Sequence, residues 1–370
     1  MSTCELPGMD IGRLHADIPV IQGGMGVGIS LSGLASAVAN EGGIGVIASV
    51  GIGEYEDDIK TNYKEANKRA LIREIKKARD MTGGIIGVNI MVALSDCDTL
   101  VEGSVEAGAD IVLIGAGLPL KLPANLPLDD LDSLSTRLVP IVSSAKAANI
   151  ICKNWYKRYK YTPDAIIVEG PMAGGHLGFR KEQIHDPDYA LEHLVEDVLE
   201  AVEPYKQQAG KDIAVIAAGG IYTGEDIFKF MQMGAAGVQM ATRFVTTFEC
   251  DAAQAFKEAH VNCSKEDIVI ITSPVGLPGR AINNAFLQKV ESGETVPYSC
   301  PWKCLKTCDV LNSPYCIADA LSQAKLGLFE RGFAFAGENA YRNTEIISVK
   351  ELVQNLKQEY IQTAALYLSA

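Results

Sequence analysis

The chain has 370 residues, of which 48% are hydrophobic and 21% charged, and its formal net charge is −13. This length and composition are typical of one large globular domain with an appendage, or of two ordinary domains. The acidic balance argues against non-specific nucleic-acid binding, which needs a surplus of Lys and Arg to neutralise phosphates.

The sequence also argues against membrane association and secretion. No stretch approaches the roughly 18 uninterrupted apolar residues that a membrane span requires. The first ten residues include Glu5 and Asp10 and have no apolar block, which is unlike a signal peptide. The nine cysteines are an odd number in a chain long enough to fold without disulfides, so we predict reduced thiols and a cytoplasmic location.

The organising feature of the sequence is an alternation of short apolar runs with helical segments. The runs are rich in β-branched residues and apolar on both faces, as expected of parallel strands covered by helices. The eight predicted strands are Pro19–Gln22, Ile44–Val50, Ile85–Val92, Asp110–Gly115, Leu138–Ser143, Asp164–Glu169, Ile213–Ala218 and Gly237–Ala241. The predicted helices are Ser30–Asn40, capped by Ser30 or Ser32, and Glu56–Asp80, Ala145–Tyr159, Asp188–Ala209, Glu225–Met233 and Cys250–His260. Pro119, Pro123 and Pro127 weaken the helical pattern of residues 117–137.

Eight strand–helix units in about 240 residues fit a closed (β/α)8 barrel. A doubly wound open sheet is the main alternative, and Gly24-Met25-Gly26-Val27-Gly28 superficially resembles its glycine fingerprint. The spacing is GxGxG, however, and the second strand ends without an acidic residue that could bind a ribose. We therefore predict a barrel over residues 1–260 and a C-terminal extension, residues 261–370, that forms a lid or capping subdomain.

Three loops that follow predicted strands are rich in glycine: residues 22–26, 169–176 and 217–221. The working loops of such barrels follow the carboxyl ends of the strands, and glycine lets several backbone N–H groups approach one anion. Gly219-Gly220 and Ala241-Thr242 occupy the last two strand-end loops, where barrels often hold a phosphate. A tight turn would explain one such loop, but three glycine-rich loops at the same end of the predicted strands favour a ligand.

Polar residues at the strand ends are the candidates for chemistry. His176 could transfer protons near neutral pH or donate a hydrogen bond to a reduced flavin. If the ligand is a flavin phosphate, Asn89 could bind its planar ring, Glu169 a ribityl hydroxyl, and Ser143 the flavin or the substrate. For each of these residues the alternative is a purely local role in a turn or at a strand end.

Six segments together resemble the nitronate monooxygenase (2-nitropropane dioxygenase) family, to which FMN-dependent enoyl-acyl-carrier-protein reductases also belong. They are Pro19–Met25, Gly87-Val88-Asn89, Ala173-Gly174-Gly175-His176, Ala217–Ile221, Gly237–Phe244 and Gly279-Arg280-Ala281. The resemblance covers roughly residues 6 to 345. It implies a barrel, FMN without a flavin–protein bond, and a catalytic His176 close to the flavin.

Carried over by position, the resemblance implies FMN contacts from Gly24, Met25, Asn89, Ser143, Glu169, Gly174, Gly175, Gly219, Gly220, Met240, Ala241 and Thr242. Two features depart from the family pattern. Met172 stands where an acidic residue is common, and the cysteine-rich tail is not part of the usual pattern. Both bear on the substrate rather than on the flavin.

The resemblance leaves two redox reactions open. The enzyme could oxidise alkyl nitronates with O2, or it could take hydride from NAD(P)H and reduce an enoyl thioester or a quinone. Both versions need a small-molecule substrate. The reductase could also bind an acyl carrier protein through Lys153, Lys157, Arg158 and Lys160, although a solvated helix face is the better explanation of these charges. A homodimer is left open. The rival classes are a flavin-free phosphosugar isomerase or aldolase and a non-catalytic ligand sensor.

Four cysteines lie close together in the tail: Cys300, Cys304, Cys308 and Cys316. Such thiols could hold zinc or an iron–sulfur cluster. Spacings of four residues would also place the first three on one face of a helix, as small core residues, and C-x-x-C pairs are absent. The sequence alone therefore favours structural thiols and no metal.

Overall fold

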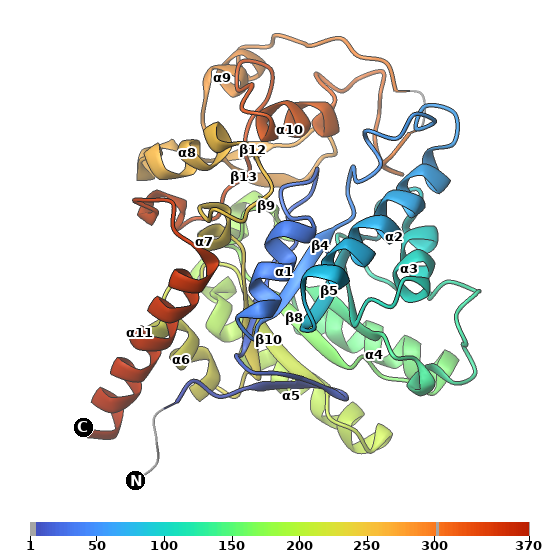
Figure 1. Ribbon diagram of the computed structural model, residues 1–370, viewed down its shortest axis with the longest axis vertical. Coiled ribbons are helices and arrows are strands. Elements are labelled where there is room, and N and C mark those ends of the chain that lie inside the picture. The colour runs from blue at the N-terminus through green and yellow to red at the C-terminus, as the bar shows by residue number, and fades with distance from the viewer. Residues whose placement is uncertain (1–4, 301–302, 370) are drawn as a thin grey trace.

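The computed structural model describes residues 5–300 and 303–369 and contains a closed barrel of eight parallel strands (Figure 1). The predicted (β/α)8 architecture is confirmed. The strands, in their order around the barrel, are β10 (Ala214–Ala218), β11 (Gly237–Met240), β3 (Val20–Gln22), β4 (Ile44–Ala48), β5 (Ile85–Met91), β6 (Ile111–Gly115), β7 (Arg137–Val142) and β8 (Ala165–Glu169). Each corresponds to one predicted strand.

Helices cover the outside of the barrel. They are α1 (Ser32–Asn40), α2 (Tyr63–Met81), α3 (Cys97–Glu106), α4 (Ala145–Tyr159), α5 (Leu191–Ala209) and α6 (Gly224–Gln232). The last helix of the chain, α11 (Val349–Ser369), packs against α6 and α1 and so completes this outer layer, as Figure 1 shows. The connection between β6 and β7 contains only a short 3-10 helix, Leu131–Ser133, as its prolines suggest.

The start of helix α2 and the cap of helix α1 differ from the prediction. Helix α2 begins at Tyr63 instead of Glu56, because residues 56–62 form turns. Neither Ser30 nor Ser32 caps α1. Instead, Asp251 accepts hydrogen bonds from the backbone N–H groups of Leu31 and Leu34, at 2.8 and 3.1 Å. The cap therefore comes from a residue 220 positions away in the chain.

A hairpin that the sequence did not reveal closes the amino-terminal end of the barrel. Strands β1 (Met9–Ile11) and β2 (Leu14–Ala16) pair antiparallel, and Met9, Ile11 and Ala16 join the apolar cluster inside the barrel. The inner cluster is separate from the larger one between the strands and the helices. The barrel is thus a packed core, and its open end is the one formed by the carboxyl ends of the strands.

The chain after the barrel strands covers that open end. Helix α8 (Gln254–Asn262) contains the expected boundary at residue 260, and α9 (Ala285–Glu291) and α10 (Ile317–Lys325) follow it. Strands β12 (Ile268–Thr272) and β13 (Pro278–Ile282) form an antiparallel sheet with the two-residue strand β9, Gly175–His176. Within the described residues, no helix combines the length and the apolar character that crossing a bilayer demands.

Candidate active site

The glycine-rich loops converge at the carboxyl end of the barrel. The Gly23 N–H donates to the Met240 carbonyl at 2.8 Å, which joins the loop after β3 to the loop after β11. The Gly170 N–H donates to the Ala218 carbonyl, also at 2.8 Å, which joins the loops after β8 and β10. Four loops that are far apart in the sequence therefore line one mouth.

Gly219 and Gly220 both have a φ of +91°, a conformation that side chains other than glycine rarely adopt. A Cβ atom at Gly219 would lie 2.8 Å from the Gly170 carbonyl oxygen, and one at Gly220 would lie 2.9 Å from the Met172 Cβ. Within the described part of the chain, no group accepts a hydrogen bond from either N–H. These two donors are therefore available to an anion.

Thr242 lies beside this pair of glycines. It begins the short helix α7 (Thr242–Val245), and its Oγ1 would lie 2.5 Å from a Cβ atom built on Gly337. Gly174 packs against the same segment, because a Cβ atom built on Gly174 would lie 2.6 Å from the Gly337 nitrogen. Gly174, a predicted FMN contact, is thus a neighbour of the predicted phosphate residues Gly219, Gly220 and Thr242, and the lid segment around Gly337, which the sequence did not identify, packs against them.

The other predicted flavin residues lie at the carboxyl ends of the barrel strands or in the loops that follow them. A Cβ atom at Gly24 would meet the Asn89 Cβ at 2.4 Å, and one at Gly178 would meet the Ser143 Oγ at 2.4 Å. Glu169 ends β8 directly beside Ala218 of β10. Met25 is half-buried, whereas the side chain of Met240 is packed into the core and its carbonyl already accepts the Gly23 N–H. Gly175 and Ala241 lie in the same loops.

His176 does not sit in a free loop, as the sequence suggested, but in strand β9. Gly175 and His176 pair with Arg280 and Gly279 of β13, which fixes the backbone of the histidine. The imidazole Nε2 lies 2.7 Å from the Ser273 hydroxyl, and the ring packs edge-on against Phe335 with centroids 5.1 Å apart. The lid therefore orients the imidazole from two sides.

Arg280 holds the backbone of the loop that leads to His176. Its guanidinium is almost fully buried and donates to the Pro171 and Ala173 carbonyls, at 2.5 and 2.7 Å. Its Nε pairs with Glu338 at 2.8 Å, which supplies the counter-charge. Arg280 was quoted in a family motif, but only the structure shows what its side chain contacts.

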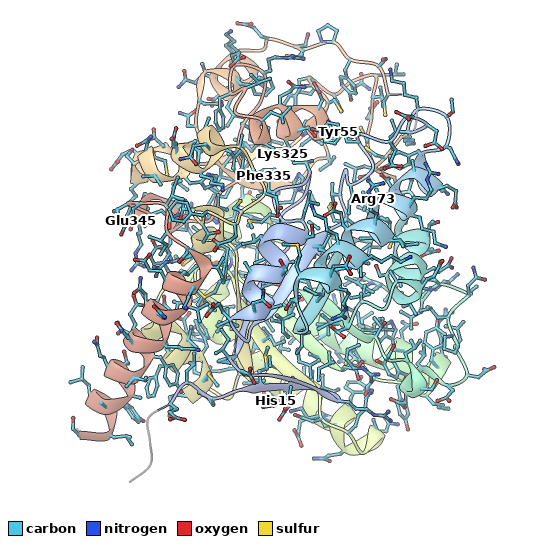
Figure 2. The ribbon with its side chains drawn as sticks, viewed as in Figure 1. His15, Tyr55, Arg73, Lys325, Phe335 and Glu345 are labelled. Atoms are coloured by element: carbon cyan, nitrogen blue, oxygen red, sulfur yellow. The ribbon has the colours of Figure 1, made fainter. Side chains whose placement is uncertain are left out.

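Two further polar groups at the mouth were not identified from the sequence. The Gln239 Oε1 is buried without a hydrogen-bond partner in the described residues, so it is placed to accept a hydrogen bond from a ligand. Lys325 of α10 reaches the loop after β3, where its Nζ would lie 2.9 Å from a Cβ atom at Gly28. Figure 2 shows Lys325 beside Tyr55, whose ring centroid is 5.4 Å from the ammonium. This places a buried ammonium against the loop after β3, with the Glu54 carboxyl within electrostatic range of it.

The basic residues considered for a carrier-protein contact lie elsewhere. Lys153, Lys157 and Arg158 are exposed on α4, and Lys160 ends that helix. Because α4 follows β7, it runs from the mouth back towards the amino-terminal end of the barrel. The positive charges therefore lie along the outside of the barrel and do not surround its carboxyl-terminal mouth.

Burial shifts the pKa values of two candidate residues in opposite directions. Desolvation raises the pKa of Glu169 to about 7 and lowers the pKa of His176 to about 4. His176 is therefore neutral near pH 7, with one ring nitrogen able to accept a proton or a hydrogen bond. The Glu169 carboxyl is partly ionised near pH 7, because its pKa is close to that pH.

We expect these two shifts to oppose each other in the stability of the flavin-free protein. Glu169 has a folded pKa above its ordinary value of 4.5, so its contribution makes the protein less stable as pH rises from 4.5 to 7. His176 has a folded pKa below its ordinary value of 6.5, so its contribution makes the protein less stable as pH falls from 6.5 to 4. The effects largely cancel between pH 4.5 and 6.5.

Single variants should expose each effect. In Glu169→Gln only the His176 effect remains, so the free energy of unfolding should rise with pH, by up to about 3 kcal/mol. In His176→Ala only the Glu169 effect remains, so the free energy of unfolding should fall with pH by a similar amount. Urea unfolding at several pH values measures both. Equal slopes in the two variants and the wild type would contradict the assignment of these shifts.

Comparison with known proteins identifies the family. Residues 10–359 match the model of the nitronate monooxygenase family. The chain belongs to this family. It is 30% identical to a Mycobacterium tuberculosis protein named (3aS,4S,5R,7aS)-5-hydroxy-7a-methyl-1-oxo-octahydro-1H-indene-4-carboxyl-CoA dehydrogenase, over 74% of this chain and 66% of that protein. It is 29% identical to a probable nitronate monooxygenase of Staphylococcus aureus strain Newman, over 76% of this chain and 79% of that protein.

Solved structures agree with this assignment. FabK from Thermotoga maritima superposes with a TM-score of 0.72 at 27% identity, covering 96% of both chains. A nitroalkane oxidase from Streptomyces ansochromogenes has a TM-score of 0.71 at 21% identity, over 95% of this chain and 98% of that one, and shares the fold. The chain is therefore an oxidoreductase enzyme with a (β/α)8 barrel.

Proposed function

We propose that this protein is an FMN-dependent oxidoreductase that oxidises alkyl nitronates with O2. The observation that carries the proposal is a neutral, immobilised His176 at the mouth where four glycine-bearing loops converge. The family supports the reaction class. The site supports an anionic, phosphate-bearing cofactor held by backbone amides.

The residues at the mouth fit FMN. The N–H groups of Gly219 and Gly220 suit its phosphate, because side chains at either position would collide with the neighbouring loop. The unpartnered Gln239 Oε1 and the Asn89 amide, beside Gly24, suit the polar edge of a planar ring. Glu169 suits a ribityl hydroxyl, since a hydrogen bond would offset its desolvation.

FMN, when bound, accepts electrons from the substrate and allows oxygen to react. The protein supplies orientation and proton handling. A neutral imidazole at His176 can accept the proton of a nitroalkane carbon or hydrogen-bond the nitro oxygens, and Ser273 keeps its ring in place. Phe335 and the lid strands cover part of the imidazole, which is half-buried.

Lys325 favours a nitronate as the substrate. A nitronate is a small anion, and Lys325 places a positive charge against the loop that carries Gly24 and Gly28. The second candidate is the NAD(P)H-dependent reduction of an enoyl thioester, which the relative named as a carboxyl-CoA dehydrogenase favours. The exposed charges of α4 lie away from the mouth, so a carrier protein would need other contacts.

One experiment separates these functions. Purified protein loaded with FMN is mixed anaerobically with propyl nitronate, NADH or NADPH in a stopped-flow instrument, and flavin bleaching is recorded. Rapid bleaching by the nitronate, with reoxidation by O2, is the result expected. Bleaching only by a nicotinamide would replace the proposal by the reductase, and protein that takes up no FMN would exclude both.

Replacing Gly220 by Leu should weaken FMN binding by at least about 10-fold, or about 1.4 kcal/mol. The new side chain would collide with Met172 in the neighbouring loop after β8 and so displace the Gly219 and Gly220 amides that we assign to the phosphate. Gly108→Leu is the matched control, because Gly108 also has a positive φ but would meet nothing within 4 Å. FMN fluorescence titration measures both. Equal weakening in both variants would mean that backbone strain alone explains the loss.

A further inference from the structure

Two segments of the lid have little regular secondary structure, one before α10 in the chain and one after it. In the first, Cys300, Cys304 and Cys308 lie outside any helix, and Cys316 directly precedes α10. The helix-face explanation for the cysteine spacing is therefore wrong. This first segment contacts the loop after β5, whereas the second reaches the loops after β8, β10 and β11. The second segment therefore bears on the predicted phosphate site.

Residues 337–343 of the second segment, which we call the clamp segment, form a compact turn. Its 3-10 helix, Ala340–Arg342, is flanked by Asn339 and Asn343 as cap residues. The Ala340 N–H donates to the Gly337 carbonyl and the Asn343 N–H to the Ala340 carbonyl, both at 3.0 Å. The hydrogen bonds of the turn therefore fix the spacing of the two asparagines.

Each asparagine amide holds the backbone of one predicted phosphate loop. Asn339 Nδ2 donates to the Gly220 carbonyl at 2.6 Å, in the loop after β10. Asn343 Nδ2 donates to the Thr242 carbonyl at 3.3 Å, in the loop after β11. One short stretch of the lid thus contacts both loops whose N–H groups we assign to the phosphate.

The side chain of Asn343 is itself held in one orientation. It is 5% exposed, and its Oδ1 accepts a hydrogen bond from the Tyr222 hydroxyl at 2.9 Å. The guanidinium carbons of Arg243 and Arg342 lie 4.7 and 4.2 Å from the centroid of the Tyr222 ring. A buried amide whose oxygen and nitrogen are both engaged has little freedom to rotate. The contact of Asn343 with Thr242 is therefore part of the packed structure.

The clamp segment also contacts the loop that leads to His176. The Glu338 N–H donates to the Met172 carbonyl at 3.1 Å. The Glu338 carboxylate pairs with Arg280, which holds two further carbonyls of the same loop. The loops after β8, β10 and β11 therefore meet at the clamp segment.

The glycines of the phosphate loop give this contact a purpose. Gly219 and Gly220 both have a φ of +91°, and glycine has more backbone freedom than any other residue. The direction of their N–H groups is therefore not set by the two residues themselves. Aligning such donors only when a ligand binds costs conformational entropy. An amide that already holds the Gly220 carbonyl reduces this cost.

We propose that Asn339 and Asn343 are positioning residues for the FMN phosphate, and that cofactor binding and docking of the clamp segment stabilise each other. The inference rests on the proposed FMN site but not on the reaction performed there. Coupling between two equilibria is reciprocal. Bound FMN should therefore hold the clamp segment against the barrel, just as the clamp segment favours FMN.

The test is flavin binding by the full-length protein after its flavin has been removed. Fluorescence titration gives the Kd for FMN and for riboflavin, which lacks the phosphate. Asn339→Ala/Asn343→Ala should weaken FMN binding by about 10-fold or more, because two amide-to-carbonyl hydrogen bonds are lost, and riboflavin binding by less than about 3-fold. The phosphorus NMR shift of bound FMN should move towards that of free FMN. Asn339→Ala alone should change both readouts in the same direction, and it replaces the double variant if that does not fold.

Asn284→Ala is the matched control. The Asn284 amide also donates to backbone carbonyls, those of Phe329 and Gly332 at 3.3 and 2.8 Å, but both belong to the lid itself. We expect this variant to keep the wild-type ratio of FMN to riboflavin affinity. The inference is overturned if the double variant binds FMN as tightly as the control, or if it loses FMN and riboflavin affinity by the same factor.

Hydrogen exchange measures the reciprocal effect without any turnover. Adding FMN to the wild-type protein should slow exchange across residues 337–343 by about 10-fold, and this slowing should be lost in the double variant. Exchange that does not respond to FMN in the wild type would contradict the coupling. Wild-type protein that binds FMN but does not oxidise nitronates leaves the inference intact, whereas protein that takes up no FMN removes the cofactor assignment and the inference together.

Discussion

Replacing His176 with Ala should reduce turnover of a neutral nitroalkane by about 10²-fold or more while FMN stays bound. The imidazole is the group that the lid orients, through Ser273 and Phe335, and its lowered pKa keeps it able to accept a proton. The predicted phosphate residues Gly219, Gly220 and Thr242, in contrast, lie in the loops after β10 and β11. Loss of the side chain should therefore affect kcat and not cofactor retention.

The measurement is steady-state turnover together with FMN content after dialysis. His185→Ala is the control, because His185 lies in the same connection after β8 but is exposed. Ser273→Ala should have a smaller effect and should shift the pH profile, since the hydroxyl contacts the imidazole. If His176→Ala turns over nearly as fast as the control, the histidine has no catalytic role.

The barrel was predictable because its signal is local. Each strand is a short apolar run, and each following helix shows its own periodicity, as in Ile111–Gly115 and Ala145–Tyr159. The loops after the strands could be placed at one end by topology alone. Thus the convergence of Gly24, Gly219 and Asn89 at one mouth followed from the order of the strands.

The lid was not predictable because its contacts are distant in sequence. Strand β9 has two residues and exists only because β13 pairs with it about 100 positions later. Arg280, Ser273 and Lys325 acquire their positions from the folded tail, and Asp251 caps a helix that begins at residue 32. Single-sequence patterns describe neighbours along the chain and carry little information on such pairs.

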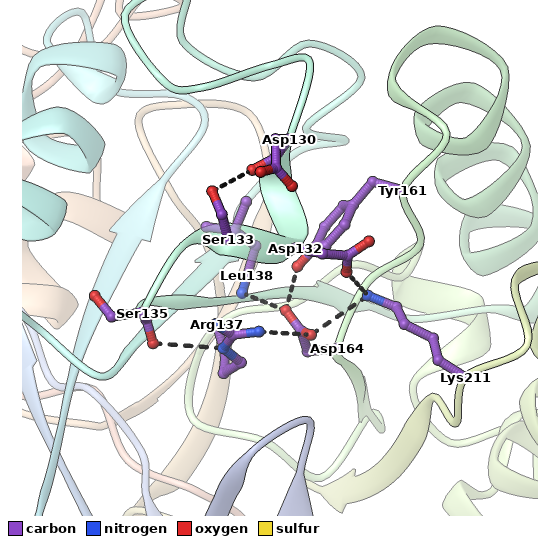
Figure 3. A network of polar contacts seen from close by, with 9 residues as sticks. All are labelled: Asp130, Asp132, Ser133, Ser135, Arg137, Leu138, Tyr161, Asp164 and Lys211. Atoms are coloured by element: carbon purple, nitrogen blue, oxygen red, sulfur yellow. Dashed lines mark hydrogen bonds and ion pairs between the residues drawn. The ribbon is translucent and has the colours of Figure 1, made fainter.

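The amino-terminal end of the barrel is held by a polar network that plays no part in the proposed chemistry (Figure 3). Asp164 precedes β8 and is 2% exposed. Its carboxylate accepts hydrogen bonds from the Leu138 N–H and the Tyr161 hydroxyl, and pairs with Arg137 and Lys211 at 3.5 and 3.4 Å. We expect this network to contribute to stability and not to catalysis, because the catalytic residues of such barrels lie at the opposite end.

Asp164→Ala should lower the free energy of unfolding by about 3–5 kcal/mol, because it leaves the buried Arg137 guanidinium without its carboxylate. Asp132→Ala is the matched control. Asp132 also pairs with Lys211, at 3.2 Å, but its side chain is 63% exposed, so its loss should cost less than about 1 kcal/mol. Urea unfolding measures both, and turnover of the folded Asp164→Ala protein should stay near wild type. Similar costs for the two variants would show that the network is screened by solvent, and that the β1–β2 hairpin and the apolar core hold this end of the barrel instead.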